Sequence, residues 1–404
     1  MEFCEHDPVP EVYKYWTAVS ALAGAVQHKV WYSPNGFMFE YPNLYIMLIG
    51  DINTGKSTCA RHAVNMLSSV SGFYKVAGKL TEASFIGEII DAGKLNSFTF
   101  NGITYKSGAV FLYASEASKA FAEMGRGNKI VNLITDYYNT CEHNFWSKQP
   151  FDSKLTKSHG REEMFNPCIN LLACSTVHWL MGRVLTKEDL EGGLGSRFIF
   201  AAHDGPIVRK ATVPGVAKSR AILFEKLVDD LKEIAQLSGN MLAEPSFFEQ
   251  HVQYQTEHDQ RLLKLKQSDP VLWSCVNRKA STLVLRLSML LAIDERDCVV
   301  APEHVSLKIR HMQKAWKILT EAESRLPDVL GQYSVEDKVK PRQAVIAYIR
   351  NTGVKEVRYH ELLEIFSKRC LVTEFRSIWM ELVTLKIIVL SPKATPSDRL
   401  YMVL

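Results

Sequence analysis

The chain has 404 residues, of which 47% are hydrophobic and 23% charged, a balance typical of a globular protein with a sizeable core and two or three domains. Its formal net charge of +4 is mildly basic, which permits binding to nucleic acid without demonstrating it. No apolar run reaches the roughly 18 residues of a membrane span, and Glu2, Glu5 and Asp7 do not fit a signal peptide. We therefore expect a cytoplasmic protein with no membrane partner.

The eight cysteines are scattered along the sequence. None forms a Cys-x-x-Cys pair, and we find no histidine partner at the spacing typical of zinc sites. This distribution predicts reduced cysteines that belong to the core.

The clearest pattern is a strand, loop and helix between residues 43 and 67. Residues 43–49 are a mostly apolar run typical of a central parallel strand, and residues 57–67 have the spacing of an amphipathic helix. This context predicts a phosphate-binding loop, with glycines that let the backbone wrap a phosphate chain, a lysine for the outer phosphates and a hydroxyl for Mg²⁺. Its predicted nucleotide-binding residues are Gly50, Asp51, Ile52, Asn53, Thr54, Gly55, Lys56, Ser57 and Thr58.

Glu116 is the predicted catalytic carboxylate. It follows the apolar run 108–114, and a hydrolytic phosphate loop needs a carboxylate at the end of a neighbouring strand to hold Mg²⁺ and orient the attacking water. The usual acidic pair is Ser115-Glu116 here, so either one carboxylate serves alone or another residue such as Asp136 contributes. The alternative is that Glu116 is only a first-turn acid of the helix that follows.

Residues 145–161 combine four cations with three aromatic rings. Such a segment can line a DNA channel, with the cations on phosphates and the rings on bases, or it can be an ordinary exposed hairpin. The predicted DNA-contacting residues are Lys148, Lys154, Lys157 and Arg161.

A third apolar run, residues 168–174, ends in Ser175 and Thr176. If this strand lies between the two previous ones, a hydroxyl there is placed to sense the terminal phosphate. Next, the glycine cluster 192–195 presents Arg197 directly before the apolar run 198–202. This layout suits a guanidinium that reaches a transferring phosphate, in the same subunit or across an interface, although glycine-rich turns before strands are also routine.

Helical patterns follow at residues 218–235, 247–265, 277–291 and 303–322. Arg278 and Arg286 are candidate nucleotide sensors on the third of these helices, but a basic residue on a helix is often simply solvated.

From residue 340 the order is three helices and then two strand-like runs, 387–390 and 400–403, which is the order of a winged helix. Arg376 on its third helix, with Lys393 and Arg399 on its wing, is arranged to contact DNA. Winged helices also dock proteins.

A set of segments spread over roughly residues 10–205 carries a family resemblance: 12–24, 30–32, 41–45, the phosphate loop, 114–116, 136–138, 166–167, 175–176, 179–180 and 192–197. Together they resemble the phage and mobile-element primase-helicase-like P-loop ATPases, which have RecA/AAA+-like cores. The resemblance implies that Arg197 is an arginine finger. Ser115 departs from the Asp that many ATPases have at this place.

The expected fold class is therefore α/β, a P-loop NTPase core with a parallel sheet, a helical lid-like region and a C-terminal winged helix. The expected domains are an N-terminal helical segment packed on the core (1–40), the ATPase core (41–212), a helical lid-like domain (213–335) and the winged helix (336–404).

The favoured function is an ATP-driven DNA motor of the replicative-helicase type. It would use ATP and Mg²⁺, act on single-stranded or forked DNA as a homo-oligomeric ring such as a hexamer, and meet other replication proteins. One alternative is an ATPase switch or loader that remodels a replication protein. Another, which the incomplete acidic pair at 115–116 makes credible, is a nucleotide-gated DNA-binding module without hydrolysis.

Overall fold

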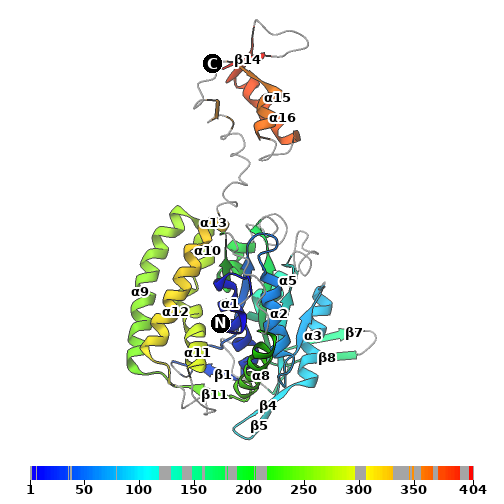
Figure 1. The fold of residues 1–404 in the computed structure, drawn as a ribbon, viewed down its shortest axis with the longest axis vertical. Helices are drawn as coiled ribbons and strands as arrows, with labels where there is room; N and C mark the ends of the chain where they lie inside the picture. The colour runs from blue at the N-terminus through cyan, green and yellow to red at the C-terminus, as the bar shows by residue number, and fades with distance from the viewer. Residues whose placement is uncertain are drawn as a thin grey trace. The chain divides into compact units, whose positions relative to one another are not determined.

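The protein divides into two compact units, Met1–Val329 and Leu330–Leu404, in a computed structural model (Figure 1). Each unit is described below by itself. The structure describes residues 2–5, 7–34, 36, 39–78, 80–117, 129–138, 148–156, 160–177, 180, 189–203, 205, 216–295, 306–330, 345, 348–349, 356–366, 372–391 and 400–403.

The first unit is a mixed α/β fold built on a five-stranded parallel sheet in the order β10-β2-β9-β6-β3. Every residue of β2 and β9 is buried, as apolar strands are when helices cover both faces of a parallel sheet. The strands are β2 (Tyr45–Ile49), β3 (Lys75–Ala77), β6 (Gly108–Ala114), β9 (Pro167–Ser175) and β10 (Phe198–Ala202).

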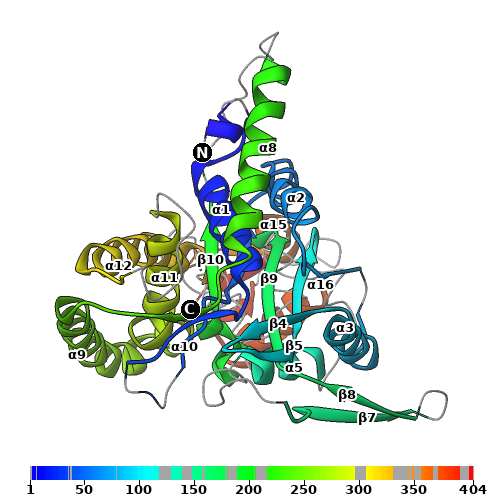
Figure 2. The ribbon, with the colours of Figure 1, turned by 90° about the horizontal axis from the view of Figure 1, so that it is seen from below.

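Helices cover both faces of this sheet (Figure 2). On one face, Ile46 and Leu48 join a core that includes α1 (Glu11–Val26) and α2 (Lys56–Leu67), and α8 (Val216–Ile234) packs over both helices. Small residues let α1 approach closely, since a Cβ at Gly24 would lie 2.8 Å from both Leu67 and Phe111. The other face carries α3 (Glu82–Leu95) and α5 (Lys129–Tyr138), with Tyr45 packed on Tyr138.

A group of helices flanks the β10 edge of the sheet, where α12 contacts β10. Residues of α11 and α12 belong to the same hydrophobic core as α1 and β2, which is why this predicted lid-like region lies within the first compact unit. These elements are α9 (Pro245–Ser268), α10 (Pro270–Val276), the turn η5 (Lys279–Leu283), α11 (Val284–Asp294), α12 (Ile309–Ser324) and α13 (Leu326–Leu330).

Among the residues that the structure describes, three smaller strand pairs complete the first unit. The strands β1 (Val30–Tyr32) and β11 (Gly239–Met241) run parallel, whereas β4 (Ser97–Phe100) with β5 (Ile103–Lys106) and β7 (Asp152–Thr156) with β8 (Gly160–Met164) are antiparallel. The pair β7–β8 projects from the body of the unit (Figure 2). The N-terminal turn η1 (Glu2–Cys4) precedes α1.

The second unit has its own core, centred on buried aromatic residues of two helices, Phe366, Phe375 and Trp379. Its elements are β12 (Glu356–Arg358), α15 (Tyr359–Phe366), α16 (Val372–Thr384), β13 (Ile388–Leu390) and β14 (Leu400–Val403), and the strands form an antiparallel sheet in the order β12-β14-β13. Among the residues described in either unit, no helix combines the length and apolar character that crossing a bilayer requires.

Candidate functional site

The loop between β2 and α2 leaves the sheet at its carboxyl edge, from the strand next to the central strand β9. Asn53 (φ 64°) and Gly55 (φ 79°) both adopt left-handed backbone conformations, and Gly55 caps the amino end of α2. Left-handed residues in such a loop turn successive N–H groups toward a common centre, and the start of a helix adds further N–H groups with a positive dipole end. The first turn of α2 carries no acidic residue that would neutralise that end. The backbone is therefore suited to hold an anion.

Two glycines of this loop sit where a side chain has no room. A Cβ at Gly50 would lie 2.1 Å from the Tyr13 hydroxyl and 2.8 Å from the His203 carbonyl oxygen. At Gly55 it would lie 2.7 Å from a methyl group of Val9. The Tyr13 hydroxyl donates to the Ile49 carbonyl at 2.6 Å, so α1 and the segment before it hold the loop from outside.

The Lys56 ammonium lies inside the loop. Its Nζ donates to the carbonyl oxygens of Gly50 (2.7 Å) and Asp51 (2.5 Å) and to the Thr54 hydroxyl (2.9 Å), which itself donates to Asp51 O at 2.8 Å. Burial lowers the pKa of Lys56, although Cys174 and Asp51 act in the opposite direction. The loop thus concentrates a buried cation at the amino end of a helix.

The other residues predicted for this loop differ in exposure. Ser57, in the first turn of α2, is half-buried, whereas Thr58 is exposed. Ile52 is 77% exposed at the tip of the loop, an unusual position for an isoleucine in a protein with a well-formed core.

Polar residues of two neighbouring strands meet the loop at the same edge. The strand β9 lies between β2 and β6, the arrangement in which Ser175 lies between the ends of the other two strands. Ser175 pairs with Ile49, and its carbonyl accepts the Gly50 N–H at 3.3 Å. Its hydroxyl donates to the carbonyl of Thr176, which is half-buried.

Glu116 reaches the same edge from β6. Ala114 pairs with Ala173, two residues before Ser175, and Glu116 lies two residues beyond Ala114, exposed to solvent. The structure therefore brings Glu116, Ser175, Thr176 and the loop together. Asp136 is exposed on α5 near Ile134, whose carbonyl accepts from Tyr45 at the opposite, amino end of β2.

Arg197 lies at the amino edge of the sheet. Phe198, the next residue, pairs with the first residue of β2, and the loop leaves β2 after its fifth residue. At about 3.3 Å per residue, this separates Arg197 from the loop by roughly 16 Å. Arg197 is buried, its Nη1 donates to the Gly193 carbonyl, and its guanidinium lies 5.7 Å from the centre of the Tyr138 ring. The sequence allowed Arg197 to act on a phosphate in its own subunit or across an interface. The structure does not support action on the loop of the same chain.

The two sensor candidates also lie away from the loop of their own chain. Arg286 is completely buried, with Nε 3.1 Å from a Glu40 carboxylate oxygen and Nη1 bonded to the carbonyl (3.0 Å) and side-chain oxygen (2.8 Å) of Asn43. Asn43 precedes β2, so Arg286 fastens α11 to the amino edge of the sheet. Arg278 is half-buried before η5, after a helix that packs on the turns η3 (Leu190–Leu194) and η4 (Gly195–Arg197).

The structure describes only some of the residues predicted to contact DNA. Lys148 is exposed just before β7, and Lys154 and Arg161 belong to the projecting strands β7 and β8. Arg376 is exposed on α16 of the second unit. Lys157, Lys393 and Arg399 lie outside the described residues.

Sequence reasoning missed a cleft of about 780 Å³ whose wall residue His203 donates its N–H to Ile49, the residue before the loop. It is formed by α1, the end of β10 and α12, and its walls include Tyr15, Trp16, His203 and Ala322. Burial raises the pKa of Tyr15 to about 12. Within the described part of the chain, the buried Tyr15 hydroxyl and the buried Nε2 of His203 have no hydrogen-bond partner. The cleft is largely apolar, as small-molecule sites usually are.

Comparison with known proteins adds no family assignment: no protein-family model and no curated protein matches the chain.

Proposed function

We propose that the chain is a P-loop ATPase that binds ATP and Mg²⁺ at the Gly50–Ser57 loop. The observation that supports this proposal most directly is the buried Lys56 ammonium, which is held at the amino end of α2 by a loop with left-handed residues at Asn53 and Gly55. This combination of backbone N–H groups, a helix end and a lysine fits a triphosphate. Gly50 and Gly55 support the loop conformation, because a Cβ at either place would collide with Tyr13 or Val9, which pack against the outside of the loop.

The neighbouring groups suit the remaining parts of Mg²⁺-ATP. Lys56 would exchange its bonds to loop carbonyls for bonds to the outer phosphates, and Ser57 with Glu116 would hold Mg²⁺, which neutralises phosphate charge. The exposed Glu116 would orient the attacking water, and Ser175 or Thr176 would contact the terminal phosphate. The base would enter the cleft between α1, the end of β10 and α12, whose walls include the rings of Tyr15, Trp16 and His203.

The place of Arg197 supports action between subunits. It lies roughly 16 Å of strand away from the loop of its own chain, so a finger role requires a second copy whose loop faces the amino edge of this sheet. Such a role would require a homo-oligomeric ring in the RecA/AAA+-like manner, as the resemblance implies, and a movement of the Arg197 side chain out of its buried place beside Gly193 and Tyr138. Lys148, the β7–β8 hairpin and the second unit, which we interpret as a winged helix with Arg376 exposed on α16, would then contact DNA. The complete proposal is an ATP-driven DNA motor that works with other replication proteins.

The place of Arg197 also favours a second candidate function, an ATPase switch or loader. A chain whose arginine is buried and remote from its own loop lacks one catalytic group until a partner completes the site. Such a protein would bind ATP alone and hydrolyse it only beside that partner. It would show nucleotide-dependent protein binding and little strand separation.

Steady-state ATP hydrolysis with and without single-stranded DNA tests these proposals. For a motor we expect DNA-stimulated turnover that Lys56→Ala, Glu116→Gln and Arg197→Ala abolish, with each variant checked for folding by circular dichroism. Mixing Lys56→Ala with Arg197→Ala should restore part of the activity, because some interfaces then pair an intact loop with an intact arginine. Activity of Arg197→Ala equal to that of the wild type would contradict the shared site, and negligible wild-type turnover with every nucleic acid would leave the switch as the better reading.

A further inference from the structure

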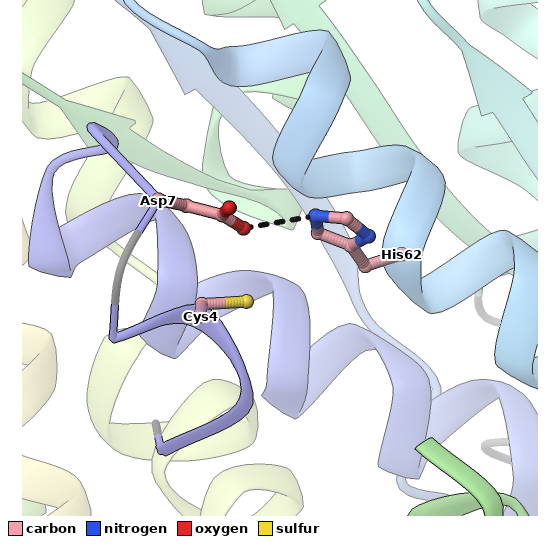
Figure 3. A group of neighbouring side chains, drawn as sticks. All are labelled: Cys4, Asp7 and His62. Atoms are coloured by element: carbon pink, nitrogen blue, oxygen red, sulfur yellow. Dashed lines mark hydrogen bonds and ion pairs between the residues drawn. The ribbon is translucent and has the colours of Figure 1, made fainter. Parts of the chain in front are cut away.

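The cluster of Cys4, Asp7 and His62 is held together by a fourth side chain, Arg220. The three side chains converge from the N-terminal segment and from α2 (Figure 3). Arg220, on α8, donates to both oxygens of the Asp7 carboxylate at 2.8 and 2.7 Å, and its Nη2 lies 3.1 Å from His62 Nε2. The guanidinium therefore supplies the positive charge of this cluster, which joins three segments of the chain.

A separate cleft lies at the amino edge of the sheet, where α1, α2, α3 and α8 end beside the start of β6. This amino-edge cleft has a volume of about 640 Å³, and its walls come from segments 27–29, 69–72, 95–99 and 232–238 and from Ser107. The 12 residues of α2 place its two ends roughly 18 Å apart. The amino-edge cleft is therefore distinct from the anion-binding loop.

A partly buried lysine without an opposite charge lies in the wall of this cleft. The Nζ of Lys29 donates to the carbonyl oxygen of Ala235, a second wall residue. Burial lowers the pKa of Lys29 to about 8, and no neighbouring charge among the described residues offsets this effect. None of the described residues that line the cleft is acidic. Because a charge removed from water is costly unless it is paired, this ammonium is suited to an incoming anion.

The rest of the amino-edge cleft is rich in hydrogen-bond donors. Lys232 adds a second cation to the lining, although it is exposed and paired with Asp229 at 2.8 Å. The carbonyl of Gly72, which could repel an anion, already accepts from the side-chain amides of Gln27 and Asn96 at 2.8 and 3.2 Å. Six hydroxyl side chains also line the cleft, those of Ser69, Ser71, Ser97, Thr99, Ser107 and Ser238.

We propose that the amino-edge cleft binds the phosphate group of a small phosphorylated molecule, with Lys29 as its charged anchor. Bonds from an ammonium to a phosphate oxygen are among the stronger hydrogen bonds in proteins, and several hydroxyl donors suit a group with several acceptor oxygens.

The size of the cleft leaves room for the organic part of such a molecule, since small-molecule sites span about 300–1,000 Å³. Leu95, which is 74% exposed, and Phe98 line the cleft and offer apolar contacts. This inference does not depend on ATP binding or hydrolysis.

Pyridoxal 5′-phosphate is a suitable probe, because it combines a phosphate with an aldehyde that reacts with neutral amines. The aldehyde carbon forms a C=N bond to Nζ with loss of water, and borohydride then reduces this bond to a stable amine that peptide mass mapping locates. The full-length Lys56→Ala protein is used, so that the Gly50–Ser57 loop does not compete for the phosphate.

The low pKa of Lys29 should make it react early. At about pH 7.5, an amine with a pKa of about 8 is neutral roughly 200-fold more often than an ordinary lysine. We expect labelling of Lys29 to be at least about 10-fold faster than that of Lys226, because nucleophilic attack requires the neutral amine. Lys226 is the matched control, since it is exposed on α8 and does not line the cleft.

Pyridoxal, which carries the aldehyde without the phosphate, separates recognition from reactivity. The ratio of Lys29 to Lys226 labelling should be about 10-fold higher with pyridoxal 5′-phosphate than with pyridoxal, as one charge-assisted contact implies. Inorganic phosphate should slow the labelling of Lys29 and leave that of Lys226 unchanged.

Direct binding of inorganic phosphate, followed by phosphorus NMR, provides the second readout. In the Lys56→Ala protein the added change Lys29→Gln should remove binding, and Lys226→Gln should preserve it. The proposal is overturned if Lys29 is labelled no faster than Lys226, or if the two reagents give equal labelling ratios. It is also overturned if the Lys29→Gln protein, with native circular dichroism, binds phosphate as its parent does.

Discussion

Replacing Gly50 with alanine adds a methyl group to a place already filled by other atoms. The new Cβ would lie 2.1 Å from the Tyr13 hydroxyl oxygen and 2.8 Å from the His203 carbonyl oxygen, so at least one neighbour must move. Overpacking of this kind costs about 1–3 kcal/mol of unfolding free energy. The change should also weaken nucleotide binding, because the displaced atoms support the loop.

Tyr13→Phe removes the nearer obstacle. On its own it loses a hydrogen bond to the Ile49 carbonyl, at a cost of about 1 kcal/mol, since that carbonyl still accepts the His203 N–H at 2.9 Å. In the Tyr13→Phe background Gly50→Ala meets only the His203 oxygen as a close contact. Its cost should therefore fall by about 1 kcal/mol or more, a coupling expected of residues in direct contact.

Urea denaturation of the four proteins of this cycle measures the coupling directly. Gly87→Ala is the matched control, because no atom lies within 4 Å of a Cβ built there and the residue is in a helix, so alanine should stabilise by about 0.5–1 kcal/mol. Costs of Gly50→Ala and Tyr13→Phe that add to within about 0.5 kcal/mol would refute the proposed contact.

Two further predictions concern the buried ionisable side chains of Arg286 and His28. Arg286→Ala should destabilise the protein by about 3–5 kcal/mol in denaturant titrations, because it leaves Glu40 buried without its ion-pair partner; unchanged stability with reduced ATP turnover would instead favour a sensor. Burial, followed by the charge of Lys29, lowers the pKa of His28 to about 3 in the folded protein. In the unfolded chain the pKa of His28 is about 6.5, so between these two values the unfolded chain binds one more proton than the folded protein. The contribution of the neutral His28 to the free energy of unfolding is therefore complete above pH 6.5, and it is lower by about 2 kcal/mol at pH 5. His28→Gln should lack that part of the pH dependence, and identical pH profiles for the two proteins would contradict it.

Local patterns in the sequence were sufficient to predict the elements of the sheet that carry the site. The apolar runs ending at Ile49, Ala114 and Cys174 are buried strands, because an all-apolar run has few other stable places in a parallel sheet. The strand β9 lies between β2 and β6, which meets the condition for Ser175 or Thr176 to lie between the ends of those two strands. The basic segment includes the antiparallel pair β7 and β8, in agreement with the hairpin alternative.

Contacts between distant segments could not be predicted in the same way. Arg286 looks like any helical arginine until Glu40 and Asn43, more than 240 positions away, are found to surround it. The role of Tyr13 in closing over Gly50, the unsatisfied atoms of Tyr15 and His203, and the convergence of Cys4 with His62 likewise exist only in three dimensions. The short strands β1, β4 and β11 were missed because three or four residues give too little periodicity to recognise.

Direct binding of ATP is the measurement closest to the central claim that the Gly50–Ser57 loop is a nucleotide site. Isothermal titration of the full-length protein with ATP and Mg²⁺ should give saturable binding with one site per chain, and Lys56→Ala should lose it. Lys75→Ala, which changes a lysine on β3, should bind as the wild type does. Absence of binding by the folded wild type, or equal binding by Lys56→Ala, would contradict the account.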